Sequence, residues 1–237
     1  ALPPTDVEHC ADDRAQKNER ARLFGDWVLQ LFGSILAHDG GGGGILDVAG
    51  GKGELSLYFS LAGHRVTLVD PRPTSGFLSK WQRKMLRRSG MPPFSVAHEL
   101  FGDASMALAH DASVIVGMHP DEATEAIVDV AIAARKPFAV VPCCVFSRLF
   151  PSRRLLNGEP VASHSSFVQY LSEKHPNART ANLGFEGKAT VVYCIDFDVR
   201  TEDVPGLCCG ECPEIDDEDD VTVPAANTSS RRIQKSA

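Results

Sequence analysis

The stretch Ile45-Leu46-Asp47-Val48-Ala49-Gly50-Gly51-Lys52-Gly53-Glu54-Leu55-Ser56 decides the fold of this chain. Two apolar residues lead into an acid, a run of small residues follows, and helical periodicity begins at Glu54. This order predicts a buried strand that delivers the chain into a glycine-rich loop, which in turn opens a helix. Because glycine has no Cβ, such a loop lets the backbone approach a ligand closely. Asp47, at the end of the strand, can accept hydrogen bonds from a cationic or hydroxyl-bearing ligand.

A second strand-like segment follows the loop. Arg65-Val66-Thr67-Leu68-Val69 ends in Asp70, seventeen residues after Gly53. In nucleotide-binding α/β sheets, an acid at the end of the second strand typically accepts hydrogen bonds from ribose hydroxyls. The loop and this acid together predict a site for a nucleotide-like cofactor.

The loop resembles the first motif of the class I S-adenosylmethionine-dependent methyltransferases, which reads acid-x-Gly-x-Gly-x-Gly. In this chain the motif is Asp47-Val48-Ala49-Gly50-Gly51-Lys52-Gly53, with Ala49 where the family has its first glycine. The resemblance implies S-adenosylmethionine as the cofactor. It also implies that an acid near position 103 binds the adenine amino group. The cofactor-binding residues expected on this basis are Asp47, Ala49, Gly50, Gly51, Gly53, Asp70, Asp103 and Met118.

A dinucleotide-binding fingerprint, G-x-G-x-x-G, is the rival interpretation of the same loop. Gly51-Lys52-Gly53 supplies its first two glycines, but Ser56 stands where the third glycine should be. Asp47 also precedes the loop, as in the methyltransferase motif. We therefore favour a methyltransferase over a dehydrogenase.

Strand-like and helix-like segments alternate after an N-terminal helix that we expect from Asp12 to about Leu36. This alternation predicts a doubly wound, mostly parallel, Rossmann-like α/β sheet of the methyltransferase type. We expect a flexible N-terminus (1–11), a single methyltransferase-fold domain (12–200) and a Cys-containing, acidic, disordered tail (201–237). The expected strands are 45–47, 65–69, 94–98, 113–117, 138–141 and a late edge or antiparallel strand within 189–199; the expected helices are 54–62, 77–89, 121–135 and 165–174.

The loop after the fourth strand carries the candidate catalytic residues. Ligands of doubly wound sheets bind at the carboxyl ends of the strands, so this loop should face the cofactor. Methyl transfer needs the nucleophile held in line with the methyl group, and a ribose hydroxyl also needs a base. His119 and Asp121 are the candidates for this role, since histidine titrates near neutrality. The alternatives are that Asp121 caps the next helix and that His119 packs or binds backbone.

Two further segments narrow the resemblance. Gly51–Ser56, His119 and Pro142–Cys144 together resemble the eukaryotic tRNA acceptor-stem 2′-O-methyltransferases and the methyltransferase-like proteins related to them. That group tends to have His-x-Cys-Gly after the fourth strand, whereas this chain has His-Pro-Asp-Glu at 119–122. It often has His after the Cys pair, whereas this chain has Val-Phe at 145–146.

The cysteines do not predict a metal site. Pro142, Cys143 and Cys144 are expected to line the substrate side of the pocket by shape, because adjacent cysteines bridge poorly and lack neighbours at zinc-ligand spacing. A second cluster, Cys208, Cys209 and Cys212, supplies at most half of a zinc motif. The seven cysteines are an odd count, and three of them lie in apolar strand-like runs. This pattern favours an intracellular, reducing compartment.

Basic residues gather on the helix expected at 77–89 and just after the Cys pair. Such residues could hold phosphates, although a solvated helix face is the alternative. The candidate substrate-binding arginines are Arg83, Arg87, Arg148 and Arg153. We expect RNA (tRNA or rRNA) or a ribonucleoprotein as partner. The net charge of −7 does not exclude RNA, because seven acids without a base lie in 211–220 and leave the rest of the chain nearly neutral.

Three functions remain open at the level of sequence. The first is a methyltransferase acting on RNA. The second is a methyltransferase-fold subunit of a ribonucleoprotein assembly that has lost catalysis, which the altered motif after the fourth strand would explain. The third is a methyltransferase acting on a protein or a small molecule. A membrane-spanning protein is not expected, since no apolar run approaches the length that crosses a bilayer.

Overall fold

The computed structural model describes residues 6–38 and 43–198 of the 237-residue chain. The first helix, α1, spans Asp6–His38, so residues 6–11, which the sequence assigns to a flexible N-terminus, are helical. The tail expected at 201–237 lies outside the described residues. Among the helices of the described part, none is long and apolar enough to cross a membrane.

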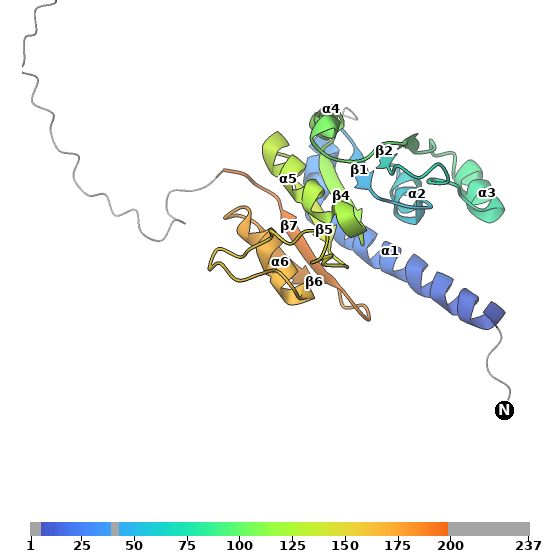
Figure 1. The fold of residues 1–237 in the computed structure, drawn as a ribbon. Helices are drawn as coiled ribbons and strands as arrows, with labels where there is room; N and C mark the ends of the chain where they lie inside the picture. The colour runs from blue at the N-terminus through green and yellow to red at the C-terminus, as the bar shows by residue number, and fades with distance from the viewer. Residues whose placement is uncertain (1–5, 39–42, 199–237) are drawn as a thin grey trace, which may run out of the picture. The chain divides into compact units, whose positions relative to one another are not determined.

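Seven strands form one sheet in the order β3-β2-β1-β4-β5-β7-β6 (Figure 1). The first five strands pair in parallel, whereas β7 pairs antiparallel with both β5 and β6. The strands are β1 Ile45–Val48, β2 Val66–Val69, β3 Ser95–Ala97, β4 Val114–Met118, β5 Phe138–Val141, β6 Arg179–Asn182 and β7 Thr190–Cys194. The expected doubly wound, mostly parallel architecture is confirmed.

Helices cover both faces of the sheet, which explains why every residue of β1 and β5 is buried rather than every second one. On one face, Phe24 and Phe32 of α1 and Phe59 of α2 belong to one buried cluster. On the other face, residues of α4, α5 and α6 form a second cluster that includes Ile127 and Phe167. The remaining helices are α2 Glu54–Leu61, α3 Lys80–Ser89, α4 Met106–Asp111, α5 Thr124–Ala134 and α6 His164–Glu173, with short 3₁₀ turns η1 at Asp103–Ser105 and η2 at Asp121–Ala123.

Three features differ from the sequence prediction. α3 begins at Lys80 rather than Phe77, because Ser79 and Gln82 form a capping box that fixes the helix start. The late strand, β7, is antiparallel, as one of the two expectations had it, but it is short and lies inside the sheet rather than at its edge, since β6, which the sequence did not predict, pairs with its outer side. α4 was also not anticipated.

Candidate functional site

A cavity of about 360 Å³ opens where β1, β2 and β4 end. This is the edge at which doubly wound sheets bind ligands. Its walls are the ends of β1 and β2, the apolar pair Leu100 and Phe101, and the segment 120–123. We refer to it as the strand-end cavity.

The glycine loop after β1 is shaped mainly by the protein's own packing. A Cβ at Gly50 would lie 2.6 Å from the Asp47 carboxylate, and one at Gly53 would lie 2.7 Å from the Phe94 ring. Gly53 also has a φ of 87°, which L-residues with a Cβ seldom adopt. Gly51 differs, because its nearest neighbour is the Arg72 guanidinium, at 3.4 Å from the Cβ position. Gly51 nevertheless has a φ of 59°, which also favours glycine, so all three glycines suit the backbone or the packing of this loop.

Asp47 is buried beneath this loop. Its Oδ2 accepts a hydrogen bond of 2.6 Å from the Ser56 hydroxyl, whereas its Oδ1 has no hydrogen-bond partner among residues 6–38 and 43–198. Burial raises the pKa of Asp47 to about 7. A buried acceptor without a partner costs free energy, and a ligand that donates to it would recover that cost.

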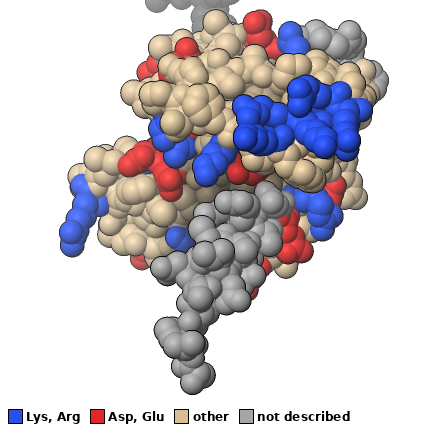
Figure 2. Space-filling model, turned by 90° about the vertical axis from the view of Figure 1, so that its right-hand side faces the viewer, with Lys and Arg blue, Asp and Glu red and all other residues tan. Residues whose placement is uncertain are grey.

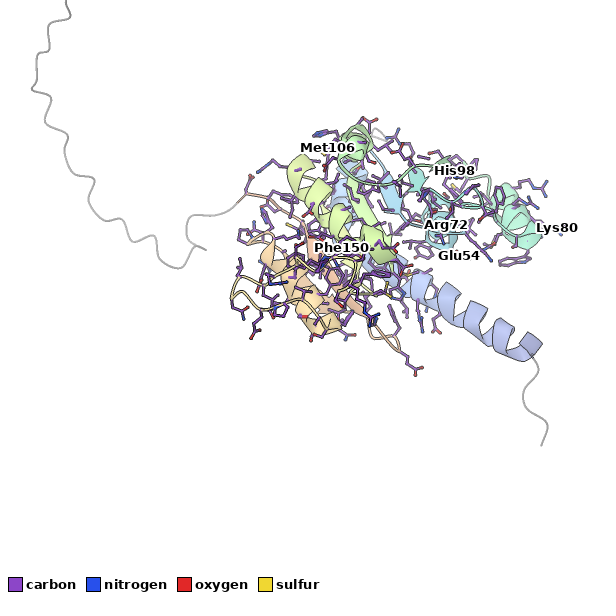
Figure 3. The ribbon with its side chains drawn as sticks, in the orientation of Figure 1. Glu54, Arg72, Lys80, His98, Met106 and Phe150 are labelled. Carbon is purple, nitrogen blue, oxygen red and sulfur yellow. The ribbon has the colours of Figure 1, made fainter. Side chains whose placement is uncertain are left out.

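Asp70 sits at the end of β2, as predicted, and its carboxylate is fully engaged. Its Oδ2 accepts from the Gly51 amide at 3.1 Å and from the Arg72 guanidinium at 2.6 Å. Its Oδ1 accepts from the Arg72 backbone amide at 3.0 Å and from Nε at 2.9 Å. Burial alone would raise the pKa of Asp70, but the hydrogen bonds from Arg72 hold it well below its usual range. The side chain of Arg72, labelled in Figure 3, is 64% exposed, so it covers the loop without being locked into the core.

His119 and Asp121 both adopt positive φ angles, 52° and 50°, just after β4. Such backbone strain in non-glycine residues is often found at functional sites. His119 Nε2 lies 3.0 Å from the Lys188 carbonyl oxygen, and its ring meets Phe185 edge-on. Because a carbonyl can only accept, we assign the proton to Nε2, which leaves Nδ1 as an acceptor. Burial lowers the pKa of His119, so the neutral ring prevails at pH 7.

Asp121 lines the strand-end cavity and contacts the Cys pair. The Cys143 thiol donates to Asp121 Oδ1 at 3.1 Å, and burial raises the pKa of Cys143 to about 12. Cys143 is therefore a neutral thiol rather than a nucleophile at pH 7. Among the described residues, one group of side chains is suited to a metal ion: Asp121, Cys143 and Cys144 offer ligand atoms within 4.8 Å of one another. The sequence does not predict this grouping.

Several predicted residues are not among those that line this cavity. Asp103 is exposed in η1, and Met118 packs against the core cluster beneath α1. Pro142 is buried, and its carbonyl oxygen lies 3.0 Å from His164 Nε2. Arg148 is exposed. Arg83 and Arg87 line a separate groove on α3.

The prediction that Arg153 binds substrate is wrong. Its side chain is buried, pairs with Glu125 at 2.7 Å and donates to the Val145 carbonyl at 2.8 Å. Its guanidinium also stacks on Phe150 and Phe167, with 3.8 Å and 4.7 Å to the ring centroids. These contacts enclose the Arg153 guanidinium within the protein, so its charge does not face a phosphate outside.

Sequence reasoning missed three contributors to the site. Arg72 directly follows the Asp70-Pro71 pair, a position from which it could have been suspected as a partner for the acid. Leu100 and Phe101 form a cavity wall without any motif. Lys188 contacts the carbonyl of Cys143 and binds His119 through its own carbonyl, from a loop far away in the sequence.

No family model and no curated protein matches the chain. Among solved structures, a magnesium protoporphyrin IX methyltransferase from Synechocystis PCC 6803 with bound SAH is similar at 14% identity and a TM-score of 0.48, covering 81% of this chain and 88% of that one. An rRNA methylase from Streptococcus thermophilus is similar at 9% identity and a TM-score of 0.45, covering 84% and 100%. A methyltransferase from Geobacter sulfurreducens is similar at 13% identity and a TM-score of 0.43, covering 82% and 91%. All three TM-scores are below 0.5, and the function proposed below rests on the residues of this chain.

Proposed function

We propose that this chain is an S-adenosylmethionine-dependent methyltransferase with RNA as its methyl acceptor. One observation carries the proposal: the glycine loop, the buried Asp70 and the strand-end cavity meet where β1 and β2 end. The motif in this loop is the one that resembles the class I methyltransferases, down to the acid that precedes it.

The residues at the strand-end cavity fit an adenosyl group. Asp70 offers acceptors for ribose hydroxyls once the exposed Arg72 side chain turns outward, and Leu100 and Phe101 offer apolar walls for a purine. The unpaired Oδ1 of Asp47 is a buried acceptor under the loop. When bound, S-adenosylmethionine supplies a methyl group activated on a sulfonium.

The sheet favours this cofactor over a dinucleotide. Dinucleotide-binding sheets have the order 3-2-1-4-5-6 with parallel strands. Here the antiparallel β7 lies between β5 and β6. Ser56 stands where a dinucleotide-binding motif has its third glycine, and its hydroxyl donates a hydrogen bond to Asp47 inside the protein. This residue therefore also favours S-adenosylmethionine over a dinucleotide.

His119 and Asp121 would act on the acceptor. The neutral His119 ring, held by the Lys188 carbonyl through Nε2, presents Nδ1 as a proton acceptor. Asp121 lines the cavity and would orient the acceptor hydroxyl. The resemblance to the tRNA acceptor-stem 2′-O-methyltransferases suggests a ribose hydroxyl as that acceptor.

A methyltransferase-fold subunit without catalysis is the second candidate. It is favoured by the hydrogen bond that Cys143 donates to Asp121, which occupies one oxygen of that carboxylate within the protein. Such a subunit would bind the cofactor and RNA but transfer no methyl group.

Calorimetry with S-adenosylmethionine and S-adenosylhomocysteine tests the cofactor. Asp70→Asn should weaken binding about tenfold or more, because hydrogen bonds to a charged acceptor are lost. Asp111→Asn is the matched control, since Asp111 is exposed and does not line the cavity; its affinity should equal that of the wild type. Equal losses in both variants, or no binding by the wild type, would contradict the proposed site.

Transfer of a labelled methyl group into total cellular RNA and protein tests the acceptor. We expect label that ribonuclease releases and protease does not. Label that only protease releases would replace RNA by protein as the acceptor. Cofactor binding without transfer to any fraction would favour the non-catalytic subunit.

A further inference from the structure

A second and larger hollow lies on the other side of the glycine loop. It is a groove of about 1030 Å³ between α3 and the edge strand β3, and we call it the α3 groove. Four basic side chains form one wall: Lys80, Arg83, Lys84 and Arg87. The aromatic residues Phe77 and Phe94 also line the groove.

In the part of the chain that the structure describes, the positive charges of this wall are not paired with acidic side chains. Within the described part of the chain, none of the four basic side chains forms an ion pair or hydrogen bond, and the residues that line the groove include no Asp or Glu. Figure 2 views the side of the molecule on which α3 lies in Figure 1 and shows a contiguous group of Lys and Arg there. An unneutralised row of this kind attracts a polyanion.

The groove also offers stacking surfaces. The side chain of Phe77 is 67% exposed, although burial of an aromatic ring is strongly favourable. Phe94 and Val96 add apolar area beside it. Basic side chains that follow a backbone, next to an aromatic ring on which bases stack, are the combination that binds single-stranded nucleic acids. An acidic polypeptide would use the charges but not the ring.

α3 holds these side chains in a defined spacing. Its start is fixed by the capping box of Ser79 and Gln82, and its end by Gly90 in the left-handed conformation. Arg83 and Arg87 are one turn apart, about 6 Å along the axis. This step suits successive phosphates of an extended strand.

The groove is joined to the loop of the proposed cofactor site. The Gly76 amide donates to the Gly51 carbonyl at 2.9 Å, and Phe94 lies against Gly53. We propose that the α3 groove binds a single-stranded segment of nucleic acid, with phosphates on the basic wall and a base stacked on Phe77. This inference deepens the proposed function, on which it rests for the choice of RNA, by naming the form of the RNA and the surface that holds it.

Arg87 and Arg88 provide a matched pair for the test. Both are exposed in the last turn of α3, but Arg87 lines the groove and Arg88 does not. The probe is a labelled oligouridylate of about 12 nucleotides, within the range of site sizes known for single-strand binding. We expect Arg87→Gln to weaken its binding and to reduce the slope of log K against log salt by about 0.7, the value for one phosphate contact. Arg88→Gln should leave both unchanged; equal effects in the two variants would refute the groove.

Phe77 and Trp81 form the second pair. Both are exposed aromatic residues, at 67% and 68%, but Trp81 faces a smaller hollow beside α2. Phe77→Ala should weaken oligouridylate binding at least about fivefold, the effect of losing one stacked base. Trp81→Ala should not change it. If Phe77→Ala has no effect, bases do not stack in the groove and the proposal fails.

Two further measurements identify the occupant and separate this inference from the proposed function. Polyglutamate is tested as a competitor of the labelled oligouridylate. If it displaces the label as well as unlabelled oligouridylate of equal charge does, the groove binds an acidic protein and the proposal is overturned. Calorimetry with S-adenosylmethionine should give the wild-type affinity for Arg87→Gln and Phe77→Ala. A wild-type protein that binds the oligonucleotide but not the cofactor would refute the methyltransferase and leave the α3 groove standing.

Discussion

Ala49 adopts a backbone conformation that favours glycine. Its φ of 56° places it in the left-handed region, where the Cβ of an L-residue costs about 1 kcal/mol or more. Ala49→Gly removes this cost but adds flexibility to the unfolded chain, so the free energy of unfolding should rise by up to about 1 kcal/mol. Ala62→Gly is the control. Because Ala62 has a φ of −77°, this variant should be less stable than the wild type by about 0.5–1 kcal/mol. Urea denaturation distinguishes the two; a loss of stability in both would show that Ala49 is not strained.

Asp47 makes the stability of the protein depend on pH. Its pKa rises from 3.8 in the unfolded chain to about 7 in the folded one. Between these values the folded state binds more protons than the unfolded state, so stability falls as pH rises through this window and levels off above it. The asparagine of Asp47→Asn cannot titrate. Between pH 4 and about 7, the free energy of unfolding of the wild type should therefore fall by a few kcal/mol relative to that of this variant. Denaturation curves at several pH values measure the difference; a constant difference would mean that Asp47 is ionised throughout.

Arg72 competes with any ribose for Asp70. Three of the four hydrogen bonds to the Asp70 carboxylate come from Arg72, so a ribose hydroxyl must displace the guanidinium. The Arg72 side chain is largely exposed, so the pair is worth about 1 kcal/mol or less. Arg72→Gln should therefore tighten binding of S-adenosylmethionine by up to about fivefold in calorimetry. The gain should vanish when Asp70→Asn is added, and weaker binding by Arg72→Gln alone would show that Arg72 holds the cofactor instead.

At the scale of elements, periodicity and buried runs sufficed for most of the sheet. The segment 138–141 is apolar throughout and is a strand with those bounds, because both faces of a parallel sheet are covered. β6, with the sequence Arg-Thr-Ala-Asn, carries no such signal, since it is an edge strand with little burial. The start of α3 was missed because a capping box outweighs the helical pattern that begins at Phe77.

The candidate site was predictable where one sequence motif contains both the residues that form the turn and the side chain that would bind a ligand. The glycine loop and Asp70 are of this kind, because the strand–loop–helix order fixes where they lie. The partner of His119 was not predictable, since the Lys188 carbonyl reaches it from the loop between β6 and β7. An arginine near a motif likewise does not reveal whether it faces solvent, and Arg153 turned inward where an acid and two aromatic rings were available.

At the scale of the whole molecule, Arg153 links parts that the sheet itself does not hold together. It lies in the segment between β5 and α6, and it bonds Glu125 of α5 while stacking on Phe167 of α6. Glu125 in turn pairs with Lys174, just after α6, and accepts from Tyr170. α5 and α6 therefore share one partly buried network of charges.

Arg153→Ala removes one partner of Glu125, which keeps Lys174 and Tyr170, and it also removes the packing of the guanidinium on Phe150 and Phe167. The variant should lower the free energy of unfolding by about 1–3 kcal/mol, as measured by urea denaturation. Arg148→Ala, at an exposed position five residues earlier, should change it by about 0.5 kcal/mol or less. Because the Arg153 guanidinium is enclosed, the fraction of Arg153→Ala protein that remains folded should bind oligouridylate as the wild type does. A loss of RNA affinity without a loss of stability would instead restore Arg153 as a ligand for phosphate.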